Sequence, residues 1–364
     1  MKLKDKIMQV VWPKQLRRGI RLVLRPVLVK FPRLAGFYYA FDDSFSREFR
    51  GAIAGQIHFE KSHAHASGHG GRYTLRRNTH RLEKGLIMRP QKGPFAQQYL
   101  QQTVELHAQL LAQGSTNDAS DALLLRWSGD VLRRYFQVVP AGASKVVDKA
   151  RAAFEKALQQ GQNSASGDSA DKPHAPYERD LSHISVSYDD LLKLAQRRRS
   201  VRWYLPKPVP RQLIDNAIVV AGLSPSACNR QPFEFCVYDD PALVAKIAKI
   251  PGGTSGFAHN FPCFIVIVGK LRAFSGEHDR HVPFIDASLA AMALQFALEA
   301  QGLSSCCVNW QDHADQEREI ERAMSLEPDE RVIMCLSLGY PDPQGQVPHS
   351  TKKPLDELRS FNRQ

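Results

Sequence analysis

The sequence predicts an α+β fold, in which a mostly helical N-terminal region precedes a domain of helices packed on a mixed sheet. Apolar residues recur with a helical period in three stretches of the first half, residues 95–114, 121–139 and 144–161. The second half instead alternates helix-like stretches with short runs rich in β-branched residues. Such alternation is typical of a layered domain with both kinds of element.

Each element of the second half has its own local signal. Helices are expected where apolar residues recur every three or four positions, over residues 188–200, 210–223 and 241–250. Strands are expected over four short apolar runs, residues 233–240, 263–270, 304–310 and 331–341. Residues 286–303 are almost wholly apolar, which predicts a long helix that is buried on most sides.

A change of composition divides the chain. The stretch "GQNSASGDSADKPHAPYERD" is polar and rich in small residues, as linkers are. We therefore expect a tail over residues 1–35, a helical region over 36–160, a linker over 161–177 and an α+β domain over 178–364. No internal repeat interrupts this division.

The positive charge belongs to the tail. The 364-residue chain has a formal net charge of +12, but residues 1–34 hold ten Lys and Arg against one acidic residue. The nearly neutral remainder argues against a nucleic-acid-binding protein. A basic and apolar tail is able to lie on an anionic membrane surface. An amphipathic helix packed on the protein itself and a disordered arm are the alternatives.

The cysteines indicate a reducing compartment. All six lie in the second half without a C-x-x-C pair, several of them in apolar runs. No apolar run reaches the length of a spanning helix, and charged residues break the best N-terminal stretch. We expect a cytoplasmic protein, with peripheral contact at the inner face of the membrane through residues 1–34 as an open alternative.

Four histidines lie close together in "HFEKSHAHASGHGG", residues 58–71: His58, His63, His65 and His69. Imidazole is a common metal ligand. The small filler residues and the lack of nearby carboxylates or thiols favour a loop, so no metal site is expected. In the following "NTHRLEKGL", Thr79 is a candidate helix cap, and His80 and Glu83 share one helical face.

The stretch "RRRSVRWYLPKPVP" begins at Arg197 and concentrates positive charge before an extended, proline-rich segment. Arg198, Ser200 and Arg202 alternate, so they are expected on one edge of an extended chain. Two guanidinium groups and a hydroxyl on one edge suit a phosphate. A solvated charged face is the alternative, with Arg197 facing solvent.

A second polar stretch, "AGLSPSACNRQPFEF", joins a predicted helix to a predicted strand at residues 221–235. Its small polar side chains, Ser224, Ser226, Asn229 and Gln231, are able to hydrogen-bond a polyol chain or a ring edge of a ligand. Residues of this kind are also ordinary turn formers. Cys228 is expected to be a small loop residue.

The ordered set of motifs resembles the nitroreductase family of flavin mononucleotide (FMN) enzymes. The two stretches above are followed by "DASLAAMALQFALEAQGLSSCCVNW", "VIMCLSLGYP" and "STKKPLDEL", so that the resemblance covers about residues 187–360. It implies a mixed, mainly antiparallel sheet flanked by helices, and a homodimer with the flavin at the subunit interface. The mostly helical N-terminal region is an extension to that domain.

The resemblance also implies which residues hold the cofactor. Arg198 and Ser200 would contact the ribityl phosphate, with Arg199 between them, and Arg202 would reach the N1 and C2-carbonyl side of the ring. A fixed cation there lowers the cost of reducing the flavin. The remaining implied contacts are the backbone N–H of Asn309 at flavin N5, Lys352 at the phosphate, and a loop from the partner subunit with Pro225, Ser226, Asn229 and Gln231.

Two positions depart from the family pattern. Ser350 stands where the family often has an additional lysine, and Trp310 stands where it usually has glycine near the flavin. We expect Trp310 to reshape the substrate pocket. A "HRLEKGL" segment before such a domain resembles a less characterised branch of the family. There, His80 and Glu83, with Lys84, would cover the flavin face and help to set specificity, or form only a local ion pair.

The implied function is ping-pong hydride transfer from NAD(P)H through flavin N5 to a nitroaromatic, a quinone or a specialised small molecule. This chemistry requires no side-chain acid or base. The first alternative is a specialised flavin reaction such as dehalogenation or oxidation of a bound intermediate. The second is a flavin-binding scaffold tethered by the basic tail. The residues do not distinguish NADH from NADPH.

Overall fold

The computed structural model describes residues 30–31, 34, 45–66, 68–90, 93–113, 118–161, 173–182 and 184–363. The chain divides into two compact units, Met1–Gly51 and Ala52–Gln364. Nearly all of the predicted tail, and most of the predicted linker at residues 161–177, lie outside the described residues. The boundary between helical region and α+β domain therefore stays a prediction.

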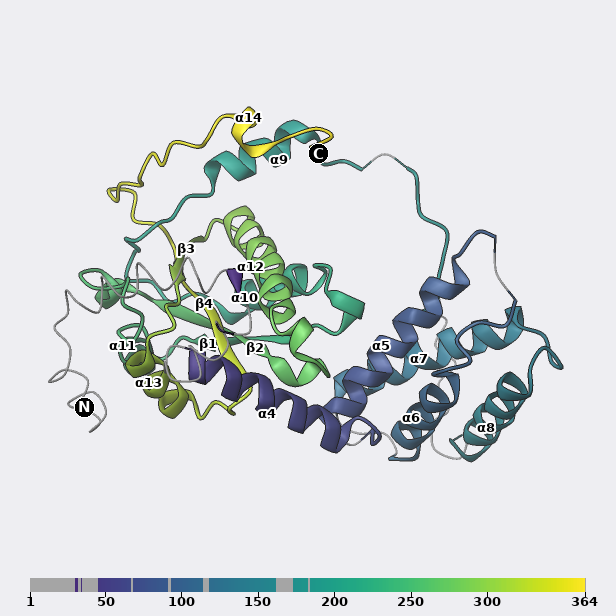
Figure 1. Cartoon of the computed structure of the whole chain (residues 1–364). Coiled ribbons are helices and arrows are strands. Elements are labelled where there is room, and N and C mark those ends of the chain that lie inside the picture. The colour runs from purple at the N-terminus through teal and green to yellow at the C-terminus, as the bar shows by residue number, and fades with distance from the viewer. Residues whose placement is uncertain are drawn as a thin grey trace, which may run out of the picture. The chain divides into compact units, whose positions relative to one another are not determined.

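Five helices make up the described N-terminal region (Figure 1): α4 (Ser46–Ser62), α5 (His69–Leu86), α6 (Leu100–Ala112), α7 (Ala119–Val138) and α8 (Lys145–Gly161). Helices α6, α7 and α8 confirm the three periodic stretches. Their apolar faces share a core in which Leu100, Val131 and Tyr135 are fully buried. Burial of this shared face, more than intrinsic propensity, holds such helices together.

The loop expected over residues 58–71 is confined to the turn between Ser62 and His69, and the expectation that Thr79 caps a helix is wrong. Residues up to Ser62 belong to α4, and α5 begins at His69, so that Thr79 lies in mid-helix. The glycines misled the prediction. A Cβ atom at Gly71 would lie 2.0 Å from the His65 carbonyl oxygen, and one at Gly70 would lie 2.7 Å from that of Phe59. These glycines allow close packing at the start of the helix and do not mark a loop.

The C-terminal region is built on a four-stranded sheet in the order β1-β2-β4-β3, in which every neighbouring pair is antiparallel. The strands are β1 (Phe233–Tyr238), β2 (Cys263–Lys270), β3 (Ser304–Asn309) and β4 (Glu330–Gly339). All four occupy the predicted runs. The predicted α+β class with a mainly antiparallel sheet is therefore confirmed.

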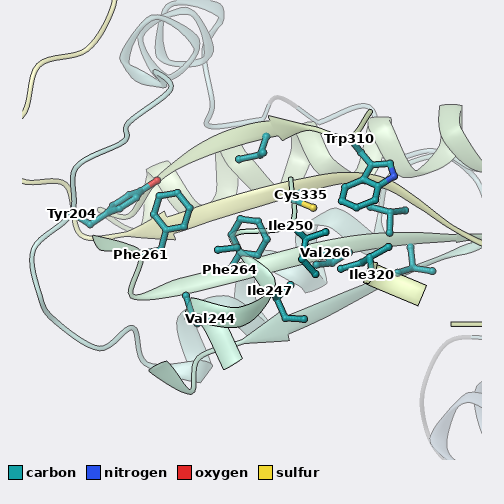
Figure 2. Packing of buried hydrophobic residues seen from close by; sticks show 14 of the residues in the cluster. Tyr204, Val244, Ile247, Ile250, Phe261, Phe264, Val266, Trp310, Ile320 and Cys335 are labelled. Carbon is teal, nitrogen blue, oxygen red and sulfur yellow. The ribbon is translucent and has the colours of Figure 1, made fainter. Parts of the chain in front are cut away.

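Helices cover both faces of the sheet. The elements that complete this region are α9 (Tyr188–Arg197), α10 (Arg211–Gly222), α11 (Pro241–Ile247), α12 (Val282–Ala300), α13 (Ala314–Met324), α14 (Leu355–Leu358) and the short 3₁₀ turns η2 (Ala227–Asn229), η3 (Ala258–Asn260), η4 (Leu271–Ala273) and η5 (Glu277–Asp279). Alternate residues of β2 face opposite sides. Phe264 and Val266 pack with α11 and α13 (Figure 2), whereas Ile265 and Ile267 pack with α10 and α12.

Helix α12 is less covered than its composition predicts. Within the described residues, the segment Glu277–Ala300 is the one helix long and apolar enough to cross a membrane, and half of it is buried in the protein. This is weak evidence for a span, because core helices have the same composition. Its apolar side chains Ile285, Leu289 and Met292 are exposed, while Asp286, Gln295 and Glu299 are buried.

Candidate functional site

The arginine-rich segment runs beside the sheet edge. Ser200 forms a parallel bridge with Ser305 at the start of β3, and the Val201 N–H donates to the Ser305 carbonyl at 3.2 Å. Val201 is buried, so the segment is anchored by an apolar side chain as well as by backbone pairing. The predicted extended segment contains a tight turn at Ser200, because the Val201 N–H also donates to the Arg199 carbonyl at 3.0 Å.

Arg198, Ser200 and Arg202 all lie within electrostatic range of one cysteine of β3. Burial raises the pKa of the Cys306 thiol, and Arg202, Ser200 and Arg198, in that order, act against this rise. All three side chains are therefore close enough to affect the same sulfur atom. Arg199 lies between them, half-buried.

Arg197 forms an ion pair with a buried carboxylate. Its Nε donates to Glu299 Oε1 at 2.9 Å, and the second carboxylate oxygen of Glu299 accepts from Ser304 Oγ at 3.1 Å. The Arg197 side chain is 68% exposed and that of Glu299 is 5% exposed. The expectation that Arg197 merely faces solvent is thus incomplete, because a buried carboxylate on α12 fixes the end of α9.

Asn260 holds the second half of the arginine-rich segment. Its amide nitrogen donates to the Arg202 carbonyl at 3.0 Å, and its amide oxygen accepts from the Tyr204 N–H at 2.9 Å. The buried Tyr204 hydroxyl bonds the Val201 carbonyl at 2.7 Å and Ser337. These bonds set the backbone from which the Arg202 side chain extends, and no local sequence pattern predicted them.

The loop after α10 is strained. Cys228, Asn229 and Gln231 have φ angles of 53°, 51° and 52°, which non-glycine residues rarely adopt. Each such residue costs roughly 1–3 kcal/mol and persists only where its surroundings fix it. Here Ser226 Oγ accepts from the Gln231 N–H at 3.1 Å, and Asn229 Oδ1 accepts from Gln231 Nε2 at 3.2 Å. Pro225 at the start of the loop is exposed.

A carboxylate on α12 accepts a hydrogen bond from this loop. Asp286 is 3% exposed, and its Oδ2 accepts from the Ala227 N–H at 3.0 Å. Burial raises the Asp286 pKa, whereas the Ala227 N–H and Arg230 lower it. Asp286 and Glu299 are the two acids of an otherwise mostly apolar helix, a detectable signal that sequence reasoning missed.

Helix α12 separates the two polar segments. Asp286 holds the loop near its start, and Glu299 holds the arginine-rich segment near its end. Thirteen residues of α-helix at 1.5 Å each place these anchors about 20 Å apart. Within one chain, the loop with Ser226, Asn229 and Gln231 is therefore not brought together with Arg198, Ser200 and Arg202.

The end of β3 requires a correction. Asn309 is exposed and pairs in register with Met334. Trp310 was expected in the substrate pocket. Its indole is instead 8% exposed, packs in the core beside Ile320 (Figure 2), and donates to the buried Glu317. The strand alternation turns Trp310 toward the core, so it fills the interior and does not shape the pocket.

Two other groups of predicted residues lie apart from these segments. Lys352 is in an exposed C-terminal stretch that follows β4. On α5, His80 Nδ1 lies 3.7 Å from Glu83 Oε2, and Glu83 accepts from Trp127 Nε1 at 2.9 Å. The two side chains are therefore neighbours, and they form an ion pair only when His80 is protonated and Glu83 is ionised.

Burial lowers the His80 pKa, with Lys84 adding to the effect. Burial also raises the Glu83 pKa, and the hydrogen bond from Trp127 partly offsets this rise. Earlier turns of the same helix reach the strained loop, since α5 contacts η2.

In the described part of the chain, no three His, Cys, Asp or Glu side chains converge as metal ligands, and His58 instead pairs with Asp329 at 3.1 Å.

Comparison with known proteins identifies the C-terminal domain. The family model described as "Nitroreductase family" matches residues 195–255 and 249–340. Human iodotyrosine deiodinase 1 is 25% identical over 221 residues, covering 50% of this chain and 75% of that protein. The iodotyrosine deiodinase of Nematostella vectensis is 23% identical over 223 residues, with 50% and 83% covered.

Solved nitroreductases are similar to about half of the chain. An FMN-dependent nitroreductase from Clostridium difficile is 24% identical with a TM-score of 0.41, covering 47% of this chain and 99% of its own. A nitroreductase family protein from Streptococcus pneumoniae is 22% identical with a TM-score of 0.41, covering 47% and 99%. Residues 195–340 therefore match the nitroreductase family model, in agreement with the resemblance of the motifs.

Proposed function

We propose that this chain, which carries a nitroreductase-family domain, is an FMN-dependent oxidoreductase. The observation that carries the proposal is the bridge between Ser200 and Ser305, which sets the segment with Arg198 and Arg202 beside β3, within electrostatic range of Cys306. Guanidinium forks and a hydroxyl on one edge match the oxygens of a phosphate.

The charge of this segment fits that group. Within the described residues, Arg198, Arg199 and Arg202 form no ion pair, and the one polar contact of the Arg202 guanidinium is with the Ser200 carbonyl at 3.4 Å. No carboxylate of the described residues thus neutralises this positive charge. A phosphate dianion would neutralise it.

When bound, FMN supplies two-electron transfer between NAD(P)H and an acceptor. The protein's part is to bind and orient. Arg198, Arg199, Ser200 and Lys352 would hold the phosphate, Arg202 would place a cation beside the ring, and the Asn309 N–H would donate to it. No side-chain acid or base is needed.

We place the flavin at the interface of a homodimer. The loop with Pro225, Ser226, Asn229 and Gln231 is about 20 Å from the arginine-rich segment along α12, so a second subunit would complete the site. Helix α9 buries none of its residues, and apolar side chains of α10 and α12 are exposed, among them Val219, Leu223 and Leu289. A partner subunit would cover these surfaces.

A second candidate reaction is reductive dehalogenation, because the relatives named above are iodotyrosine deiodinases. Two electrons and one proton would replace the carbon–halogen bond by a carbon–hydrogen bond and release halide. His80 and Glu83 would contribute to the substrate pocket in either reaction, since α5 also contacts the strained loop.

Anaerobic mixing tests the proposal. The FMN-loaded protein should lose its visible flavin absorbance with NADH or NADPH, and regain it with a nitroaromatic, a quinone or 3-iodotyrosine. Recovery with the nitroaromatic or quinone supports the first reaction, and iodide release supports the second. A flavin that no nicotinamide reduces and no acceptor reoxidises indicates a flavin-binding scaffold.

A further inference from the structure

A basic cavity lies between the helical region and the strained loop. Its volume is about 280 Å³, and side chains from α5, from the start of α7 and from the loop line it. The residues that the inference uses are Arg72, Tyr73, Arg76, Ser120, Arg230 and Gln231. Neither the family motifs nor the proposed FMN contacts account for the arginines of this cavity.

Arg230 is buried without a full set of partners. It is 6% exposed, and its Nε has no hydrogen-bond partner. Its guanidinium lies 4.5 Å from the ring centroid of Phe274. The nearby Asp286 carboxylate accepts a hydrogen bond from the Ala227 N–H and forms no ion pair with Arg230. Burial therefore lowers the Arg230 pKa.

The charges around the cavity do not balance. Asp121 holds Arg72 through two bonds of 2.6 Å, and Asp118, which also lines the cavity, accepts from the Ser120 N–H at 2.9 Å. Arg76 forms no ion pair among the described residues, and burial lowers its pKa. Among the residues that line the cavity, three guanidinium groups thus face one carboxylate, that of Asp118; Asp121 pairs with Arg72 from outside the lining, and Asp279 and Asp286 act on Arg230 without an ion pair.

We propose that this cavity binds an oxyanion, the carboxylate or phosphate of a small anionic electron acceptor. Arg76 and Arg230 provide the charge, while Ser120, Tyr73 and Gln231 offer neutral polar groups. This inference rests on the proposed function, because Arg230 and Gln231 belong to the loop assigned to the flavin. An oxyanion held there places the rest of the molecule next to that loop.

The remainder of the acceptor would lie along α5. Residues 73, 76, 80 and 83 share one face of that helix, since they follow each other by three or four positions. His80 and Glu83 thereby extend the cavity's polar surface by about two helical turns. The anion would fix one end of the acceptor, and these two side chains would contact its other end.

Phosphate binding to the full-length, FMN-loaded protein tests the site, by isothermal titration calorimetry with inorganic phosphate as the probe. We expect one phosphate per chain and at least about tenfold weaker binding in Arg76→Gln and Arg230→Gln, because each loses a charge-assisted bond. Arg322→Gln, which removes an exposed charge from α13, is the matched control and should bind phosphate normally.

If Arg230→Gln does not fold by circular dichroism, Arg76→Gln carries the test. Absence of saturable binding overturns the proposal. So does binding that is unchanged in Arg76→Gln but lost in Arg202→Gln, which would place the phosphate in the arginine-rich segment.

Acceptor kinetics distinguish the sources of the oxyanion. The wild type should have at least about a tenfold lower KM for 4-nitrobenzoate than for nitrobenzene, and Arg76→Gln should lose this preference. If Arg76→Gln instead changes only the KM ratio of NADPH to NADH, the anion is the donor's phosphate and the acceptor assignment is overturned. If the protein binds no flavin but still binds phosphate through Arg76, the proposed function is refuted and the oxyanion site is supported.

Discussion

The carboxylate of Asp286 accepts a hydrogen bond from the Ala227 N–H at 3.0 Å, and so ties the central helix α12 to the strained loop. Asp286→Ala would leave that N–H without its acceptor. We expect a loss of about 1–3 kcal/mol in the free energy of unfolding, measured with urea. Asp286→Asn keeps an acceptor oxygen and should lose less. Equal losses in the two variants would contradict the role of this bond.

The same carboxyl predicts a pH dependence. Because burial raises its pKa, the native state holds the proton at pH values where the unfolded state has released it. The contribution of Asp286 to stability therefore decreases as pH rises from about 4 through the raised pKa. Urea unfolding across this range should show that decrease in the wild type relative to Asp286→Asn. A constant difference between them would refute the raised pKa.

His107 predicts acid sensitivity of the helical region. Burial lowers its pKa to about 4, with Arg133 adding to the effect, and its Nδ1 lies 2.8 Å from Ser128 Oγ. The unfolded state takes up a proton first, so the free energy of unfolding should fall as pH decreases from about 6.5 to about 4, by at most roughly 1.4 kcal/mol per pH unit. His107→Gln should reduce this slope. An unchanged slope would assign the sensitivity to other groups.

The exposed face of α12 predicts dimerisation. Leu289 is 46% exposed there, and Leu289→Glu would place a charge in the proposed interface. Analytical ultracentrifugation should show a dimer for the wild type and mostly monomer for the variant, with loss of flavin. Leu123 on α7 is 59% exposed and provides the control, since Leu123→Glu should remain dimeric. A monomeric wild type that retains flavin would exclude an interfacial site.

The basic N-terminal segment predicts membrane contact. Deletion of residues 1–34 removes ten of the positive charges of the chain and should abolish cosedimentation with anionic phosphatidylserine vesicles without loss of flavin. Neutral phosphatidylcholine vesicles are the control and should bind neither protein. Equal binding of anionic vesicles by the truncated and full-length proteins would rule out the tether.

Local sequence patterns were sufficient for most elements of the fold. The strands were predictable because their apolar residues form short runs, and α6, α7 and α8 because their apolar residues recur with a helical period. Helix α13 was missed, since its sequence "ADQEREIERAM" is mostly charged and buries only Glu317 and Ile320. The start of α5 was missed because glycine that allows close packing looks like glycine in a loop.

The candidate site was predictable only in its ligand-facing residues. Arg198, Ser200 and Arg202 follow a short local pattern. Their supports do not, because Asn260 lies 58 positions from Arg202, and Asp286 lies 59 positions from Ala227. Trp310 was misplaced for a related reason. The motif gave its position in the family pattern, whereas the packing of β3 decides which way its side chain points.

Flavin binding by the purified protein tests the central claim most directly. We predict one FMN per chain from the visible spectrum, and at least about tenfold weaker FMN binding in Arg202→Gln, which loses a charge-assisted contact. Arg322→Gln should bind FMN as the wild type does. A colourless protein that FMN does not reconstitute, or an Arg202→Gln variant with unchanged affinity, would contradict the account.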